Sequence, residues 1–259
     1  MMLNVLTAGA FIGGFELVLA AVLMGLPAFG TAGKHILTAL GKAPGLDVLL
    51  SVMIWLPWVV CRVTLGWQGV LGAIAGQIVA MQIWVVVHER IHAQATQEPR
   101  INGYLNQRFG WWRNHLALWV TSIVLPVFFL IRAAQIFVYP ALTLLLGFRR
   151  YNHSEWINVS RQKFEGLVGT DLIWCLYCDW MTGVYSLGAE MLRNVESFWC
   201  PIRFYYGKKC DNCAIDFPDI NGGWVDTQGT MTDVVETLKA QMPTKGAWSW
   251  FGDRDRHRS

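Results

Sequence analysis

Residues 46–87 read LDVLLSVMIWLPWVVCRVTLGWQGVLGAIAGQIVAMQIWVVV, and this stretch decides the fold. It contains two apolar runs, Leu46–Leu65 and Gln68–Val87. Each run has the roughly 20 residues that a helix needs to cross the hydrocarbon core of a bilayer. Only Gly66 and Trp67 separate the runs. Because the connection is so short, the stretch predicts an antiparallel hairpin of two membrane helices.

A third run, Leu3–Phe29, has the same length and apolar character. No Lys or Arg precedes it, and Glu16 interrupts its middle, so it lacks the pattern of a cleaved signal peptide. We expect it to be a retained membrane helix. An ionisable residue at membrane depth usually faces a partner or a cavity, so Glu16 either pairs with Arg62 or Arg132 or belongs to a proton or substrate path, and we favour the structural pair.

Small residues recur at helical spacing in two of these runs. Gly9 and Gly13 lie in the first run, and Gly72 and Gly76 lie in the second arm of the hairpin. Pairs of small residues four apart let two membrane helices approach closely. The pattern therefore predicts contact surfaces on both helices.

The fourth apolar region, Leu116–Phe148, would be roughly 50 Å long as one straight helix, which is too long for a single upright crossing. It contains Pro126, Arg132 and Pro140. It is either one kinked span or a hairpin of two short helices that turns near Arg132. We favour the hairpin, because it places every basic cluster on one side of the membrane.

The composition also belongs to a membrane protein. Hydrophobic residues make up 54% of the chain and charged residues 15%, against about 25% in soluble domains. The net charge of +3 is too small to indicate a nucleic-acid partner. By the positive-inside rule, the basic clusters after the spans predict an N-terminus outside and a cytoplasmic C-terminal part, as in a bacterial inner-membrane protein.

We therefore expect two domains, a membrane helical domain over residues 1–150 and a small Cys-rich cytoplasmic domain over residues 151–259. In the second, Phe164–Met191 is apolar but interrupted, which indicates an amphipathic helix pair, and residues 201–229 indicate a loop. Met231–Met242 has the period of a short amphipathic helix. The predicted fold class is an all-α polytopic membrane protein with three to five membrane helices.

The strongest chemical motif is His88-Glu89-Arg90-Ile91-His92, an H-E-x-x-H sequence at the end of the hairpin. On a helix, residues four apart share a face, so the two imidazoles can meet at one metal ion. The same residues can instead be interfacial polar groups paired with Arg90, Arg113 or a partner subunit.

The motif resembles that of the membrane-embedded zinc metalloproteases, over about ten residues. Arg90 and Gln94 depart from the usual pattern of that family. The resemblance implies zinc ligation by His88 and His92, and a general-base role for Glu89 toward a zinc-bound water that attacks a peptide or protein substrate. His153 and Glu155 are the best candidates for a third ligand. Weaker candidates are Glu165 and His115.

A second metal hypothesis uses overlapping residues. The ligands would be His88, His92, His115 and His153, with Glu89, Glu155 and Glu165, and they would form a di-iron site at the cytoplasmic membrane face, similar to that of the membrane desaturases and alkane hydroxylases. The chain lacks the H-x-x-H-H boxes of those enzymes.

Five of the six cysteines fall late in the chain. They form Cys175-x-x-Cys178, Cys200 and Cys210-x-x-Cys213. Two such pairs can supply the four thiolates of a structural zinc site, which would be the second zinc of this protein. The alternatives are a redox or iron–sulfur role, or cysteines buried as small apolar residues. A cytoplasmic location disfavours disulfides.

The motifs leave three functions open, of which a histidine-ligated di-iron membrane oxygenase is the least favoured. Another is a zinc-dependent peptidase at the cytoplasmic membrane face. The third is a non-catalytic subunit of a membrane complex whose Cys-rich domain binds a partner protein.

Overall fold

The computed structural model describes residues 2–164, 166–202 and 224–241, and these residues are almost entirely helical. Within those ranges no strand forms, and only isolated bridges, such as that between Lys42 and Asn158, add β-type pairing. The predicted all-α class is therefore confirmed for the described chain. The α-helices are α1 (Met2–Gly25), α2 (Gly30–Leu40), α3 (Gly45–Leu50), α4 (Leu56–Ile91), α5 (Ile101–Phe109), α6 (Trp111–Ser122), α7 (Leu125–Ala133), α8 (Tyr139–Leu146), α9 (His153–Trp156), α10 (Gly169–Trp199) and α12 (Met231–Gln241).

Three helical segments of the described chain are long and apolar enough to cross a membrane. They are Met2–Leu40, Gly45–Ile91 and Trp111–Leu146. These segments fit an integral membrane protein with a lipid bilayer around it. The side of the membrane on which each terminus lies stays a prediction.

The chain divides into two compact units. Unit 1 comprises Met1–Leu125 and His153–Gly183, and unit 2 comprises Pro126–Asn152 and Val184–Ser259. The division into a membrane domain over residues 1–150 and a cytoplasmic domain over residues 151–259 stays a prediction.

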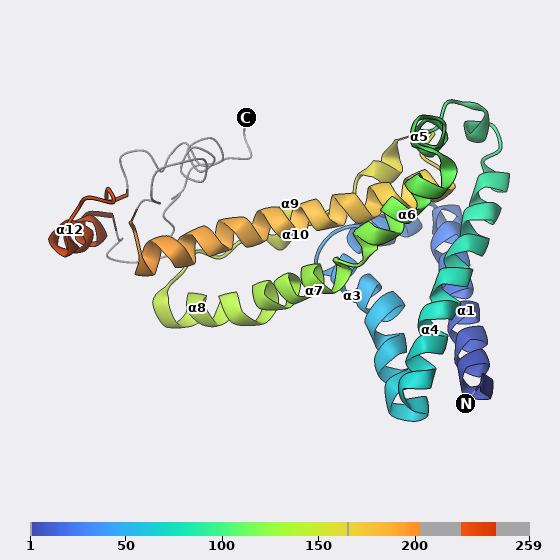
Figure 1. Cartoon of the computed structure of the whole chain (residues 1–259), viewed down its shortest axis with the longest axis horizontal. Helices are drawn as coiled ribbons and strands as arrows, with labels where there is room; N and C mark the ends of the chain where they lie inside the picture. Colours follow the sequence, from blue (N-terminus) through green and yellow to red (C-terminus); the bar gives the residue numbers. More distant parts are fainter. Residues whose placement is uncertain (1, 165, 203–223, 242–259) are drawn as a thin grey trace. The chain divides into compact units, whose positions relative to one another are not determined.

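The predicted hairpin is present in unit 1. Gly66 has φ 72° and ψ −159°, a conformation that glycine adopts readily, and there the chain reverses between the arms of α4 (Figure 1). Trp58 Nε1 donates to Gln77 Oε1 at 2.7 Å, and Gln77 Nε2 donates to the carbonyl of Met53 at 2.6 Å. These hydrogen bonds join the two arms in antiparallel register.

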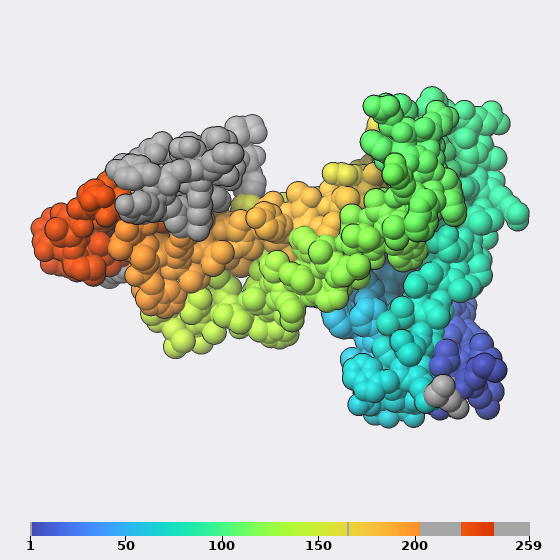
Figure 2. Space-filling view, viewed as in Figure 1, coloured from blue at the N-terminus to red at the C-terminus, as the bar shows by residue number. Residues whose placement is uncertain are grey.

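Helix α1 packs against the second arm of α4 through the predicted glycine pairs, and the atoms of the two helices are in contact in Figure 2. A Cβ added at Gly72 would lie 2.3 Å from the carbonyl oxygen of Val5, and one at Gly76 would lie 2.3 Å from that of Gly9. Ala8, Ile12, Cys61 and Ala73 form the buried cluster beside this contact. The backbones therefore approach as the small-residue pattern predicts.

Two expectations for the fourth region and for the polar residues inside the spans were wrong. The backbone is helical from Leu125 to Leu146 through Arg132, as α7, a π-helical segment Ala134–Val138 and α8, so there is no turn near Arg132. The regular structure is interrupted at Ile123–Val124 instead. Pro126 lies in the first turn of α7, where proline is tolerated because its missing N–H would have no intrahelical partner, and Pro140 lies just after the π-helical segment Ala134–Val138.

Arg132 is buried in unit 2 and donates to Gln135 Oε1 at 2.9 Å, whereas Arg62 lies over the ring of Trp67 at 4.7 Å. Among the described residues of unit 1 no ion pair involves Glu16, so its predicted pairing with Arg62 is not formed. Its pairing with Arg132, which lies in unit 2, stays a prediction.

In unit 2, the second half of α10 is held by buried polar and aromatic contacts. Gln135 Nε2 donates to the carbonyl of Val184 at 2.7 Å, and Asn194 Nδ2 donates to the hydroxyl of Tyr139 at 3.2 Å. The rings of Phe148 and Phe198 meet edge to face at 5.0 Å. The predicted helix pair over Phe164–Met191 is thus wrong, because one helix, α10, runs from Gly169 to Trp199. The predicted helix near the C-terminus is confirmed as α12.

The glycine contact makes a sharp prediction. Gly76→Ala should destabilise the folded chain by roughly 1–3 kcal/mol, because its methyl group would overlap the backbone of α1. Gly14→Ala is the matched control, since a Cβ there meets no atom within 4 Å. The measurement is the unfolding free energy of both variants in mixed lipid–detergent micelles. Equal stability of the two variants would contradict the close backbone contact.

Candidate functional site

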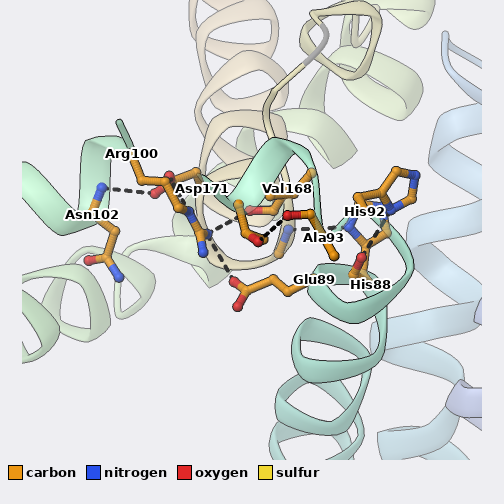
Figure 3. Close-up of polar contacts among 10 residues, drawn as sticks. His88, Glu89, His92, Ala93, Arg100, Asn102, Val168 and Asp171 are labelled. Carbon is orange, nitrogen blue, oxygen red and sulfur yellow. Dashed lines mark hydrogen bonds and ion pairs between the residues drawn. The ribbon is translucent and has the colours of Figure 1, made fainter. Parts of the chain in front are cut away.

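The H-E-x-x-H residues lie in the last turns of α4, at the end of the hairpin (Figure 3). The rings of His88 and His92 are stacked with centroids 4.2 Å apart, and Trp84 continues the stack at 4.5 Å from His88. His88 is buried, and His92 is exposed. Spacing on one helix face therefore brings the two imidazoles together, as the sequence predicts.

The hydrogen bonds of the two histidines differ. The N–H of Gly169 donates to His88 Nδ1 at 3.3 Å, so the proton of the neutral His88 ring sits on Nε2. His92 Nδ1 lies 2.9 Å from the carbonyl oxygen of His88, which can only accept, so this Nδ1 carries the proton. The Nε2 of His92 is therefore unprotonated and has a lone pair, whereas the Nε2 of His88 carries the ring proton.

This arrangement does not fit the zinc ligation that the resemblance implies. A histidine that binds zinc through Nε2 normally donates its Nδ1–H to an acceptor. At His88 that Nδ1–H would point at another donor, the N–H of Gly169. Ligation would therefore require the contact between α4 and the start of α10 to open.

Glu89 is bound to a cation rather than placed beside an open position. Its Oε1 lies 2.9 Å from Arg100, and the two side chains are 28% and 19% exposed. A Cβ added at Gly169 would lie 2.1 Å from the same oxygen. Gly169 has φ +53°, so both backbone conformation and space exclude a larger residue. The carboxylate of Glu89 thus lies between Arg100 and Gly169, the first residue of α10.

Arg100 is the centre of the site. Its Nε lies 3.3 Å from Asp171 Oδ2, and its NH2 group donates to the carbonyl of Val168 at 2.9 Å (Figure 3). Burial opposes the charge of Arg100, but the carboxylates of Glu89 and Asp171 outweigh it and raise the pKa of the guanidinium. Arg100 is therefore a permanent cation shared by two acidic side chains.

Asp171 joins two helix starts. It lies in the first turn of α10, where the helix dipole favours an anion, and its Oδ1 accepts the N–H of Asn102 at 3.0 Å in the first turn of α5. Asn114 on α6 extends the network, because its Nδ2 donates to Asn102 Oδ1 at 2.6 Å and to Asn106 Oδ1 at 2.8 Å. The site therefore joins α4, α5, α6 and the first turn of α10, which are parts of unit 1.

The structure does not gather the predicted third ligands around this pair. Within the described ranges, no group of three or more His, Cys, Asp or Glu side chains is placed to hold a metal ion. His153 and Glu155 lie on α9, and His115 lies on α6, where its Nδ1 is 3.1 Å from the carbonyl of Trp111. Glu165 lies outside the described residues. Zinc and iron stay predictions for these residues.

The cysteine hypothesis is only partly within the described chain. Cys175 and Cys178 lie on α10, and Cys200 directly follows it. Cys178 and Cys200 are exposed, which leaves their thiols accessible. Cys210 and Cys213 lie outside the described residues, so the structural zinc site stays a prediction.

A cavity of about 370 Å³ lies beside the network in unit 1, between α4, α6 and α10. Its lining is mainly apolar, with Gln82, His115 and Thr170 as polar members. His88, Glu89 and His92 do not line it. The cavity therefore offers no substrate cleft at the motif.

The sequence did not single out Arg100, Gly169 and Asp171 as site residues. The alternative of an ion-paired Glu89 is the arrangement found, but its partner is Arg100 and not Arg90 or Arg113. One signal for Asp171 exists, since Gly169-Thr170-Asp171 puts an acidic residue in the first turn of a helix. Nothing local connects it to a residue 71 positions earlier.

Comparison with known proteins identifies no relative for this chain. No family model, no curated protein and no solved structure matches it. The interpretation of the site therefore depends on its own geometry.

Gly169 supplies a test of that geometry. Gly169→Ala should destabilise the chain more than Gly110→Ala, because both glycines have positive φ but only Gly169 lies against Glu89. We expect roughly 1–3 kcal/mol of backbone cost at either position and a further 1–3 kcal/mol of overlap at Gly169. The measurement is thermal unfolding of the purified variants. If Glu89→Ala does not relieve the excess cost of Gly169→Ala, the two residues are not in contact.

Proposed function

We propose that this chain is a non-catalytic subunit of a membrane protein complex. In this proposal the H-E-x-x-H segment holds the end of the membrane helix α4 in contact with α5 and α10. The ion pair between Glu89 and Arg100 carries the proposal. A zinc peptidase needs its general base beside an open metal position, within reach of the metal-bound water. In this chain the carboxylate of Glu89 is bonded to a guanidinium that is itself held by Asp171 and by the carbonyl of Val168.

A partner protein is supported by apolar side chains exposed outside the candidate spans. On α10, Leu192 and Trp199 are 65% and 57% exposed, and on α12, Met231 is 69% exposed. Exposed apolar groups gathered on amphipathic helices are typical of surfaces that bind another protein or a membrane. In this proposal the partner binds the C-terminal part, and a structural zinc held by Cys210 and Cys213 with two of Cys175, Cys178 and Cys200 stabilises that part.

A bacterial inner membrane with the C-terminal part in the cytoplasm belongs to the same proposal. Its support is the sequence alone, through the basic residues that follow the apolar runs.

The zinc-peptidase hypothesis is the competing proposal. The stacked rings of His88 and His92 favour it, because two imidazoles already lie on one helix face with a carboxylate between them in sequence. The hypothesis requires His88 to lose the Gly169 contact and Glu89 to leave Arg100 before a metal can bind.

A double-mutant cycle tests the structural role of Glu89. Glu89→Gln and Arg100→Gln should each cost roughly 1–3 kcal/mol of stability, because the first removes one of the two carboxylates of Arg100 and the second leaves both carboxylates without their cation. The double variant should cost less than the sum of the two. Glu98→Gln is the matched control, since Glu98 is an exposed carboxylate nearby in the chain. Additive costs would contradict the proposal.

Metal analysis separates the two proposals. In a background with Cys210→Ser and Cys213→Ser, the purified chain and its His92→Ala variant should contain the same amount of zinc by mass spectrometry. The peptidase hypothesis predicts instead that His92→Ala loses zinc, and that Glu89→Gln keeps zinc but loses hydrolysis of peptide substrates.

A further inference from the structure

Glu16 is a buried carboxyl group in the middle of α1, away from the H-E-x-x-H network. Its residue is 7% exposed, and its Oε1 has no hydrogen-bond partner among the described residues. The side chain of Gln77, on the second arm of α4, lies beside the carboxyl group. Glu16 thus has a buried carboxyl oxygen without a partner next to the polar side chain of Gln77.

The polar groups around Glu16 are already used by one another. Gln77 Oε1 accepts from Trp58 Nε1, and Gln77 Nε2 donates to the carbonyl of Met53. Met53 lies in a π-helical segment, Ser51–Trp55, and such segments occur frequently at functional sites. The bundle therefore builds a small polar site around Glu16.

No charge within the bundle balances a carboxylate at this depth. The helix packed against α1 is α4, and its titratable and charged residues are Cys61, Arg62, His88, Glu89 and Arg90. Cys61 is a neutral thiol in the apolar cluster, and Arg62 stacks on Trp67 near the turn of the hairpin. His88, Glu89 and Arg90 lie in the last turns of α4, beyond Gln77 by three helical turns.

An isolated carboxylate inside a bilayer costs several kcal/mol, so an unpaired acid there is stable only when it carries a proton or binds a cation. A dehydrated metal cation needs several oxygen ligands. The nearby oxygens of Gln77 and Met53 each accept one hydrogen bond and keep one lone pair, and Oε1 of Glu16 has no partner. These three oxygens are fewer than the six or more ligands of a calcium or magnesium ion, whereas a proton needs only one of them.

We propose that Glu16, supported by Gln77, Trp58 and the carbonyl of Met53, is an intramembrane proton-binding site. In the binding step the carboxylate takes a proton from a hydronium ion and water is released, so charge and atoms balance. The neutral acid then donates or accepts one further hydrogen bond through Oε1. The site is independent of the role of Glu89, and it gives the membrane domain a ligand of its own.

A hydrophobic carbodiimide tests the proposal, because such reagents enter bilayers and add covalently to protonated carboxylic acids. The full chain is placed in lipid nanodiscs and treated across a pH series, and the adduct is located by peptide mass spectrometry. We expect an adduct on Glu16 that falls about tenfold per pH unit once the acid ionises. Glu16→Gln keeps the shape of the side chain and should lose the adduct completely.

Two controls define the negative outcomes. A water-soluble carbodiimide with an added amine should modify the exposed Glu98 and leave Glu16 unmodified. If the folded chain forms no adduct on Glu16 at any pH, the carboxyl group is not a proton-binding site. If sodium or lithium chloride suppresses the adduct at constant pH and ionic strength, the site binds a cation and the proposal is overturned.

Discussion

The arginine between two carboxylates is the interaction on which the organisation of unit 1 depends. Arg100 lies in the short connection between α4 and α5, and its partners lie at the end of α4 and at the start of α10. A charge placed in this way selects one arrangement of three helix ends, because any other leaves an acidic or basic group half-buried and unpaired. Such a pair contributes specificity to a fold even where its net stabilising energy is small.

Much of the membrane part could be predicted from residues 2–91. Run length and the two-residue connection at Gly66 predict the hairpin, and glycines four apart predict the close contact of α1 with α4. These features are local or periodic, so they can be recognised without knowing the fold. The turn expected near Arg132 is absent, since the backbone stays helical there and Arg132 donates to Gln135 one turn later.

The candidate site was harder to predict for a physical reason. The spacing of His88 and His92 is a property of one helix, whereas the role of Glu89 is set by a residue in the following loop and by Gly169, 80 positions later. A motif states which side chains share a face, and it does not state which other charges arrive there. The same four-residue spacing therefore suits a metal site and an ion-paired helix end equally well.

The two π-helical segments have a consequence for how this sequence tolerates insertion and deletion. Each segment contains one residue more than an α-helical turn needs, which rotates all following side chains by roughly 100° about the helix axis. In Ser51–Trp55 the widened turn supplies the carbonyl that Gln77 reaches, and in Ala134–Val138 it contains Gln135, which reaches the carbonyl of Val184. Deleting one residue from either segment would restore a regular helix and turn its buried glutamine contact toward lipid, so a one-residue gap there would be more damaging than most substitutions.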